Sequence, residues 1–232
     1  MSNLLEVNNI YKSIKGKEIL RGLSFNLEKG KVLGIMGPNG QGKTTLLNAI
    51  EGFLKINNGE IKLEGNNIGF ETKGEISYLQ DINIFNRSMR IRNAIDLYSD
   101  FFNDFDKDKM DNYLKFMNLD RNAKIRDLSK GMMEKFNLSL TLSRKAKLFL
   151  LDEPISGVDP VSREKILDAI LKNLSEDSSI IITTHYIGEL ERIFDEVLFL
   201  GDGKVIEYGE AEELRAKHKA SIDEIYRKIF AE

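Results

Sequence analysis

A glycine-rich segment between an apolar run and a helix-forming run constrains this chain more than any other feature. Its sequence is Gly37-Pro38-Asn39-Gly40-Gln41-Gly42-Lys43-Thr44-Thr45, which fits the pattern G-x-x-x-x-G-K followed by serine or threonine. The apolar residues 31–36 before it predict a buried strand, and residues 45–50 after it predict the start of a helix. A strand, a glycine loop and a helix in this order are the structural context of a phosphate-binding loop (P-loop).

Each residue type in this loop has a chemical reason to be there. Three glycines allow a tight backbone wrap that points several N–H groups inward: Gly37, Gly40 and Gly42. The helix that follows directs its positive dipole end to the same place. Lys43 adds a positive charge for the β- and γ-phosphates, while the Thr44 hydroxyl suits Mg²⁺ and the Thr45 hydroxyl suits a phosphate oxygen. We therefore predict that residues 37–45 bind a nucleoside triphosphate with Mg²⁺.

The composition limits the partners and the location of the chain. Its 232 residues include 41% hydrophobic and 31% charged residues, which fits a globular protein with one core or a core plus a small subdomain. The formal net charge of −3 gives no electrostatic case for nucleic acid, and the absence of cysteine excludes disulfides and thiolate metal sites. We expect a cytoplasmic protein, because we find neither a signal peptide nor an apolar run near the roughly 20 residues that span a bilayer.

Strand and helix patterns predict how the rest of the chain is divided. Residues 4–10 and 18–27 alternate as two strands of an antiparallel layer, and a turn is expected at 57–60. Short strands are expected at 60–65 and 75–79. From residue 91 to about 142, apolar residues recur at helical spacing, and the Asp-rich residues 100–111 read as a solvated loop and helix start rather than a metal site.

The C-terminal half returns to alternating strands and helices. Expected elements are a buried strand at 147–151, a helix at 161–174, a buried strand at 179–184, a hairpin of 197–200 with 204–208, and a helical tail at 211–230. The predicted fold is α/β, a P-loop NTPase with a mostly parallel core sheet, an antiparallel β layer and an inserted helical subdomain. We assign residues 1–80 and 143–232 to the nucleotide-binding core, and residues 81–142 to the helical subdomain.

Two acidic residues follow the strand at 147–151. In a doubly wound sheet, ligands bind at the carboxyl ends of the strands, so Asp152 suits a magnesium site of the Walker B kind. Glu153 follows directly and is suited to polarise an attacking water. An acidic turn of no catalytic role is the simpler alternative, but it fits poorly beside a phosphate-binding loop.

The full set of motifs resembles the ATP-binding cassette (ABC) ATPases, the nucleotide-binding subunits of ABC transporters, over almost the whole chain. The resemblance implies that Tyr11 stacks on adenine, that Gln80 contacts Mg²⁺ and senses the membrane partner, and that His185 bonds the γ-phosphate. Leu128-Ser129-Lys130-Gly131-Met132 is similar to the LSGGQ signature, and Ser156-Gly157-Val158-Asp159 is similar to the D-loop. His218, in the tail, has no such context and is expected to be solvent-exposed.

The signature departs from the family pattern at two positions. Lys130 replaces a glycine and Met132 replaces the final glutamine, so one charge is added and one amide is lost. Ser129 and Gly131, which the resemblance implies contact the γ-phosphate, are retained. We expect catalysis to survive, with an altered rate and dimer affinity.

The resemblance implies a head-to-tail dimer with a second nucleotide-binding subunit, identical or different, that encloses two ATP molecules. It also implies an integral membrane permease as partner, with this chain on the inner face of the cell membrane, and an exporter of a peptide, antibiotic or other small molecule. A regulatory or assembly ATPase and a small-molecule kinase are the alternatives. Too few residues separate Gln80 from Ser129 for the long coiled coil of chromosome-maintenance relatives, and the signature and His185 count against a kinase.

Overall fold

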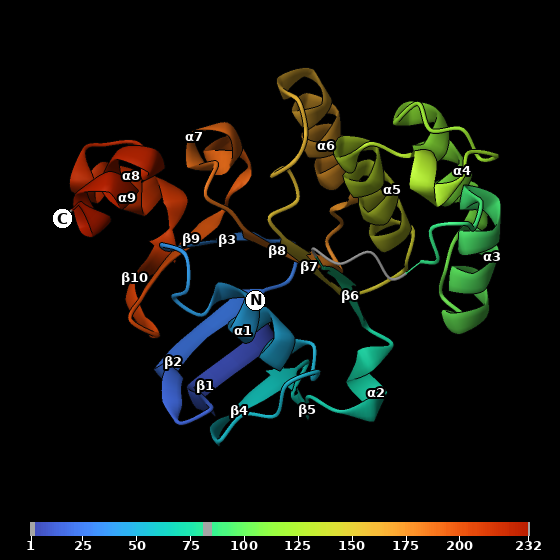
Figure 1. The fold of residues 1–232 in the computed structure, drawn as a ribbon. Helices are drawn as coiled ribbons and strands as arrows, with labels where there is room; N and C mark the ends of the chain where they lie inside the picture. The colour runs from blue at the N-terminus through green and yellow to red at the C-terminus, as the bar shows by residue number, and fades with distance from the viewer. Residues whose placement is uncertain (1–2, 81–84, 232) are drawn as a thin grey trace.

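The computed structural model describes residues 3–80 and 85–231 and contains two β-sheets with helices between and above them (Figure 1). The first sheet is antiparallel, in the order β2-β1-β4-β5. Its strands are β1 (Asn3–Ile14), β2 (Lys17–Glu28), β4 (Asn58–Leu63) and the short β5 (Asn66–Asn67). The predicted antiparallel layer is therefore present, and Leu23, Phe25 and Leu27 of β2 are all buried.

The second sheet has six strands in the order β10-β9-β3-β8-β7-β6. All neighbouring pairs from β9 to β6 run parallel, and only β10 runs antiparallel to its neighbour. The strands are β3 (Val32–Met36), β6 (Ile76–Leu79), β7 (Leu148–Asp152), β8 (Ser179–Thr183), β9 (Glu196–Gly201) and β10 (Lys204–Glu210). Its central strands are buried on both faces, as their continuous apolar runs predict.

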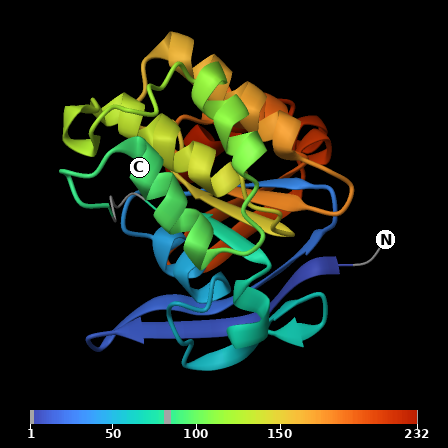
Figure 2. The same ribbon diagram turned by 90° about the vertical axis from the view of Figure 1, so that its right-hand side faces the viewer.

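Helix α1 (Lys43–Ile50) lies between the two sheets and fills the space that separates them (Figure 2). Its buried Leu46, Leu47 and Ile50 share one apolar core with the inner face of the antiparallel sheet and one face of the six-stranded sheet. The helix starts from the glycine loop, so the packing of α1 also fixes the position of that loop.

The other face of the six-stranded sheet is covered by helices (Figure 2). They are α3 (Ile91–Phe101), α4 (Lys107–Phe116), α5 (Lys130–Leu142), α6 (Pro160–Asn173), α7 (Ile187–Leu190), α8 (Ala211–His218) and α9 (Ile222–Phe230). The remaining elements are the short α2 (Phe70–Lys73) and 3₁₀ turns at Ile125–Asp127 and Glu191–Ile193. The predicted helical region between 91 and 142 thus contains α3, α4 and α5. Within the described ranges, no helix is both long and apolar enough to cross a bilayer.

Three sequence predictions are wrong in detail. Residues 57–60 are not a free turn, because Asn58 pairs with Tyr11 and β4 begins there; β1 has a bulge between Asn8 and Tyr11, opposite Gly59, whose φ is 91°. The tail is not one helix, because Lys219 adopts a left-handed conformation between α8 and α9. His218 is not freely exposed: its Nε2 lies 3.0 Å from both carboxylate oxygens of Glu207.

Candidate nucleotide-binding and hydrolysis site

The glycine loop joins β3 to α1 in a conformation that only glycine permits at several positions. Gly40 and Gly42 have φ values of 80° and 104°, in the left-handed region. Gly37 has no space for a side chain, because a Cβ atom there would lie 2.2 Å from the Leu200 carbonyl oxygen. Gly42 is the N-cap of α1 and makes no side-chain cap, so the first N–H groups of the helix face the loop.

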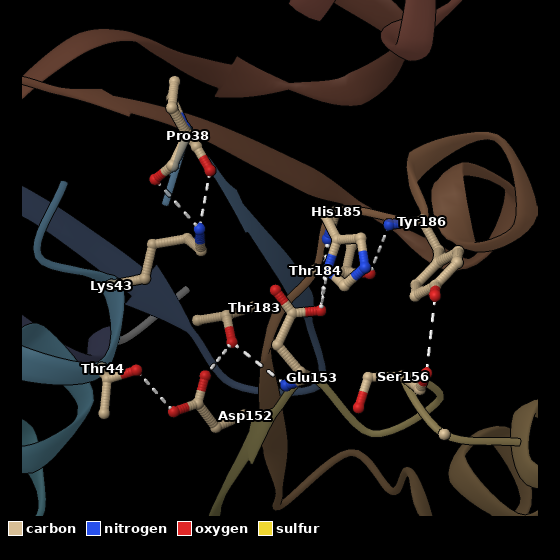
Figure 3. Close-up of polar contacts among 12 residues, drawn as sticks. Pro38, Lys43, Thr44, Asp152, Glu153, Ser156, Thr183, Thr184, His185 and Tyr186 are labelled. Atoms are coloured by element: carbon tan, nitrogen blue, oxygen red, sulfur yellow. Dashed lines mark hydrogen bonds and ion pairs between the residues drawn. The ribbon is translucent and has the colours of Figure 1, made fainter. Parts of the chain in front are cut away.

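The Lys43 side chain is buried and folds back over its own loop (Figure 3). Its Nζ donates to the Gly37 carbonyl oxygen at 2.6 Å and to that of Pro38 at 3.3 Å. Burial lowers the pKa of the Lys43 ammonium, while the charges of Glu153 and Asp152 raise it. The positive charge of Lys43, partly balanced by these two carboxylates, is therefore held at the place where the loop would receive phosphates.

Both carboxylate oxygens of Asp152, at the end of β7, accept a hydrogen bond from a threonine (Figure 3). Thr44 Oγ1, from α1, donates to Oδ2 at 2.8 Å, and Thr183 Oγ1, from the end of β8, donates to Oδ1 at 2.5 Å. The parallel pairing of β7 with β8 places Asp152 directly beside Thr183. A hydroxyl and a carboxylate fixed side by side are oxygen ligands of the kind that Mg²⁺ prefers.

Glu153 has an unusual backbone conformation and a defined side-chain partner. Its φ of 51° lies in the left-handed region, which costs energy for a residue other than glycine and is commonest at functional sites. Its N–H donates to the Thr183 carbonyl oxygen at 3.1 Å, which ties the turn to β8. Its Oε2 lies 2.7 Å from His185 Nδ1 and also accepts from the His185 N–H at 3.3 Å (Figure 3).

A cavity of about 270 Å³, the P-loop cavity, brings many of the predicted residues together. It is lined by Ile19, Asn39, Gly40, Gly42, Lys43, Thr44, Thr45, Asp152 and Glu153. Ile19, from β2, is absent from the sequence prediction, as is Thr183, which holds Asp152 in place. Both come from strands distant in sequence, and neither carries a motif that could identify it.

A second cavity of about 320 Å³, the α5 cavity, shares Asp152 and Glu153 with the first. Its lining includes Gln80, Ser129, Lys130 and Glu134. Ser129 is the N-cap of α5, and its Oγ accepts from the Met132 N–H at 3.2 Å. Gln80 and Ser129 therefore line a cavity together with the acidic pair, and neither is in the lining of the P-loop cavity.

The remaining predicted residues lie outside both cavity linings. Tyr11 lies in β1 against Gly22 of β2, where an added Cβ would meet the tyrosine hydroxyl at 2.7 Å. Gln41 Oε1 accepts from the Asp202 N–H at 2.6 Å, in the hairpin between β9 and β10. Asp159 caps α6 by accepting from the Ser162 N–H at 3.0 Å.

Comparison with known proteins agrees with this arrangement. The ABC transporter family profile matches residues 20–156. The linearmycin resistance ATP-binding protein LnrL of Bacillus subtilis is 33% identical over 216 residues, covering 89% of this chain and 69% of that protein. The Nod factor export ATP-binding protein I of Ralstonia nicotianae is 27% identical over 219 residues, covering 91% and 68%. A solved ATP-binding subunit of an ABC transporter superposes with a TM-score of 0.89 at 23% identity, covering 97% and 98%.

The two sheets, the glycine loop and the acidic pair at the end of β7 define a P-loop ATPase, which confirms the predicted fold class. The chain belongs to the ABC transporter family, in which it is an ATP-binding subunit and an ATPase.

Proposed function

We propose that this chain hydrolyses ATP at the P-loop cavity to drive a separate, membrane-embedded permease. The observation that carries the proposal is the convergence of Lys43, Asp152 and Glu153 on one cavity beside the glycine loop. Phosphate groups, a divalent cation and a polarised water need these three types of side chain within reach of one another.

The roles of the residues follow from their chemistry. The loop N–H groups, Lys43 and Thr45 bind the phosphates. Thr44, Asp152 and Gln80 would hold Mg²⁺, which when bound neutralises charge on the phosphate oxygens. The oxygen atoms of Thr44 and Asp152 that would do so are 2.8 Å apart.

Glu153 is the residue we assign to polarising the attacking water. Glu153 lines the P-loop cavity, and its Oε2 atom lies 2.7 Å from the Nδ1 atom of His185. His185 therefore restrains Glu153 and would exchange this contact for the γ-phosphate when nucleotide binds. Both side chains extend from strand ends, which fixes their relative position.

A second subunit would complete the site. Ser129, Gly131 and Asp159 stay outside the P-loop cavity of their own chain, and Ser129 opens the N-terminus of the 13-residue helix α5. In a head-to-tail dimer these residues would cap the γ-phosphate held by the other chain, so that two ATP molecules are enclosed. We further assign Tyr11 to stacking on adenine.

The permease and the cargo are proposed from the family. Residues 81–142 would act as a subdomain that faces the permease, with Gln80 at its start, and the subunit would sit at the inner face of the cell membrane. Two relatives carry names that refer to linearmycin resistance and to Nod factor export. We propose export of a peptide, antibiotic or other small molecule on this basis.

Replacement of Glu153 by glutamine tests the assignment of the water-polarising residue. Glu153→Gln should lower steady-state phosphate release at least about 100-fold, because a neutral amide does not polarise water, while ATP binding is kept. Glu164→Gln is the matched control, since Glu164 is exposed on α6 and pairs with Arg192. Turnover of Glu153→Gln within twofold of the unaltered chain would remove Glu153 from this role.

A further inference from the structure

The loop between β7 and α6 packs tightly on the first two turns of α5 at Gly157. The Gly157 N–H donates to Glu134 Oε2 at 2.9 Å. A Cβ atom added to Gly157 would lie 2.1 Å from Glu134 Oε1 and 2.6 Å from Lys130 Cε. The lysine stem and the carboxylate therefore occupy the space of a side chain at this position, and we call this arrangement the Gly157 contact.

Lys130 and Glu134 form an ion pair one helical turn apart on α5. Lys130 Nζ lies 3.8 Å from Glu134 Oε1; the lysine side chain is 70% exposed and the glutamate side chain is 15% exposed. A largely buried carboxylate is costly unless hydrogen bonds and a cation compensate it. The Gly157 N–H supplies the hydrogen bond and Lys130 supplies the charge. Glycine, which the family signature has at position 130, could not do so.

The Gly157 contact is continuous with the site of hydrolysis. The Ser156 N–H donates to the Glu153 carbonyl oxygen at 3.2 Å, so the loop begins as a turn at Glu153. Glu153, Ser156, Lys130 and Glu134 all line the α5 cavity. The loop then ends at Asp159, the N-cap of α6.

We propose that Lys130 and Glu134 are positioning residues for ATP hydrolysis, acting through Gly157. They hold the loop of residues 153–159 on α5, so that Ser129, Gly131 and Asp159 meet the second subunit as one rigid unit. The same contact keeps the Glu153 turn in place. The lysine that departs from the signature is thus a structural partner of Glu134. This inference rests on the proposed head-to-tail dimer.

Kinetics of four variants test the proposal. Glu134→Ala removes the acceptor for the Gly157 N–H and should lower kcat about tenfold with KM for ATP changed less than twofold, because the glycine loop and Lys43, which bind the phosphates, are untouched. Glu134→Gln keeps an acceptor and should retain at least one third of kcat. The kcat of Lys130→Met should fall by about the same factor as that of Glu134→Gln. The double variant, which carries both Lys130→Met and Glu134→Gln, should have a kcat no lower than that of either single variant.

Controls separate this role from loss of folding. The fraction of each variant that binds ATP measures the folded, active population, and kcat is expressed per bound ATP. Glu212→Ala removes an exposed glutamate that pairs with Arg215 on α8, and it should leave kcat unchanged.

Two results overturn the proposal: a kcat of Glu134→Ala within twofold of the unaltered chain, or equal losses in Glu134→Ala and Glu134→Gln. Failure of the dimer itself would show differently. In that case the Glu153→Gln chain would not dimerise when ATP is added, even though Lys130 and Glu134 are intact.

Discussion

Asp152 is the residue whose position is most strongly determined at the site, because each of its carboxylate oxygens accepts from a different threonine. Thr44 belongs to the glycine loop motif, whereas Thr183 belongs to β8 and is fully buried. Thr183 also holds the Glu153 N–H, with its carbonyl oxygen at 3.1 Å and its hydroxyl at 3.2 Å. One threonine therefore orients both residues of the acidic pair.

Replacement of Thr183 by valine should weaken the site without changing side-chain shape. We expect Thr183→Val to raise the Mg²⁺ concentration for half-maximal ATPase activity about tenfold, because Asp152 loses the donor that orients it. Titration of Mg²⁺ at saturating ATP measures this. Thr141→Val is the control, since the Thr141 hydroxyl bonds the Asn137 carbonyl oxygen within α5. An unchanged Mg²⁺ requirement in Thr183→Val would contradict the role of Thr183.

Glu196, at the start of β9, is a buried carboxyl group outside the site. Its Oε2 lies 2.6 Å from the Tyr208 hydroxyl, which lies 2.5 Å from the Asn26 carbonyl oxygen. A tyrosine has one proton to donate, so Glu196 must be protonated if that proton goes to Asn26. Burial raises the pKa of Glu196, Glu210 and Glu28 raise it further, and the Tyr208 hydrogen bond and Lys31 oppose them.

Because the pKa of Glu196 is higher in the folded state than in the unfolded state, its protonated form stabilises the folded chain. This stabilisation is fully present below the unfolded pKa and is lost as pH rises through the folded pKa. Glutamine does not ionise, so this stabilisation is not lost as pH rises. We therefore expect Glu196→Gln to be more stable than the unaltered chain by about 1 kcal/mol at pH 7.5. The advantage should vanish near pH 4. Urea unfolding at both pH values measures the difference in free energy of unfolding between Glu196→Gln and the unaltered chain. An equal difference at pH 7.5 and near pH 4 would refute the account.

The sequence predicts which residues form the site only where those residues belong to a recognisable motif. The glycine loop and the acidic pair have fixed spacing, and the structure places Lys43, Thr44, Asp152 and Glu153 around one cavity. Ile19 and Thr183 could not be found in this way, because their role depends on which strands lie side by side. The pairing of His218 with Glu207 depends in the same way on the packing of α8 against β10.

At the scale of elements, Arg144 joins the end of α5 to the edge of the six-stranded sheet. Its side chain is 3% exposed, and it donates to the carbonyl oxygens of Ile76 at 2.7 Å and Gly74 at 2.6 Å. It also contacts both oxygens of Asp104 at 3.1 Å and lies over the Phe102 ring. One guanidinium therefore connects α5, β6 and the segment between α3 and α4.

Replacement of Arg144 by methionine should destabilise the fold by about 3 kcal/mol, because the buried Ile76 carbonyl group, the partly buried bond to the Gly74 carbonyl group and the Asp104 carboxylate lose their donor. Urea unfolding measures the change. Arg192→Met is the control: Arg192 is exposed and pairs with the exposed Glu164, so its loss should cost less than about 0.5 kcal/mol. A loss below 1 kcal/mol for Arg144→Met would show that other contacts connect these elements.

Periodicity predicted the buried parallel strands and the amphipathic helices well, because their apolar patterns are continuous. It failed where local signals competed with tertiary contacts. Asn57-Asn58-Gly59 has the composition of a turn, yet β1 supplies hydrogen-bond partners that extend the segment as β4. The break at Lys219 carries no glycine or proline, but Ser221 and Glu224 form a capping box that begins α9, a sequence signal that the prediction of a single helical tail missed.

At the scale of the whole molecule, the two cavities meet at Asp152 and Glu153 but open to different groups. The glycine loop lies on the P-loop cavity, and the N-terminus of α5 lies on the α5 cavity. One chain therefore presents its phosphate-binding loop and its signature helix on two different cavities. This separation is the structural reason to expect that two chains share each ATP.

The mass of the Glu153→Gln chain with saturating ATP and Mg²⁺, measured by light scattering, tests this claim most directly. For a second subunit identical to the first, the account predicts a dimer of twice the 26.5 kDa chain, with two ATP bound, that returns to single chains when ADP replaces ATP. A species of 26.5 kDa that holds one ATP and does not pair would contradict it.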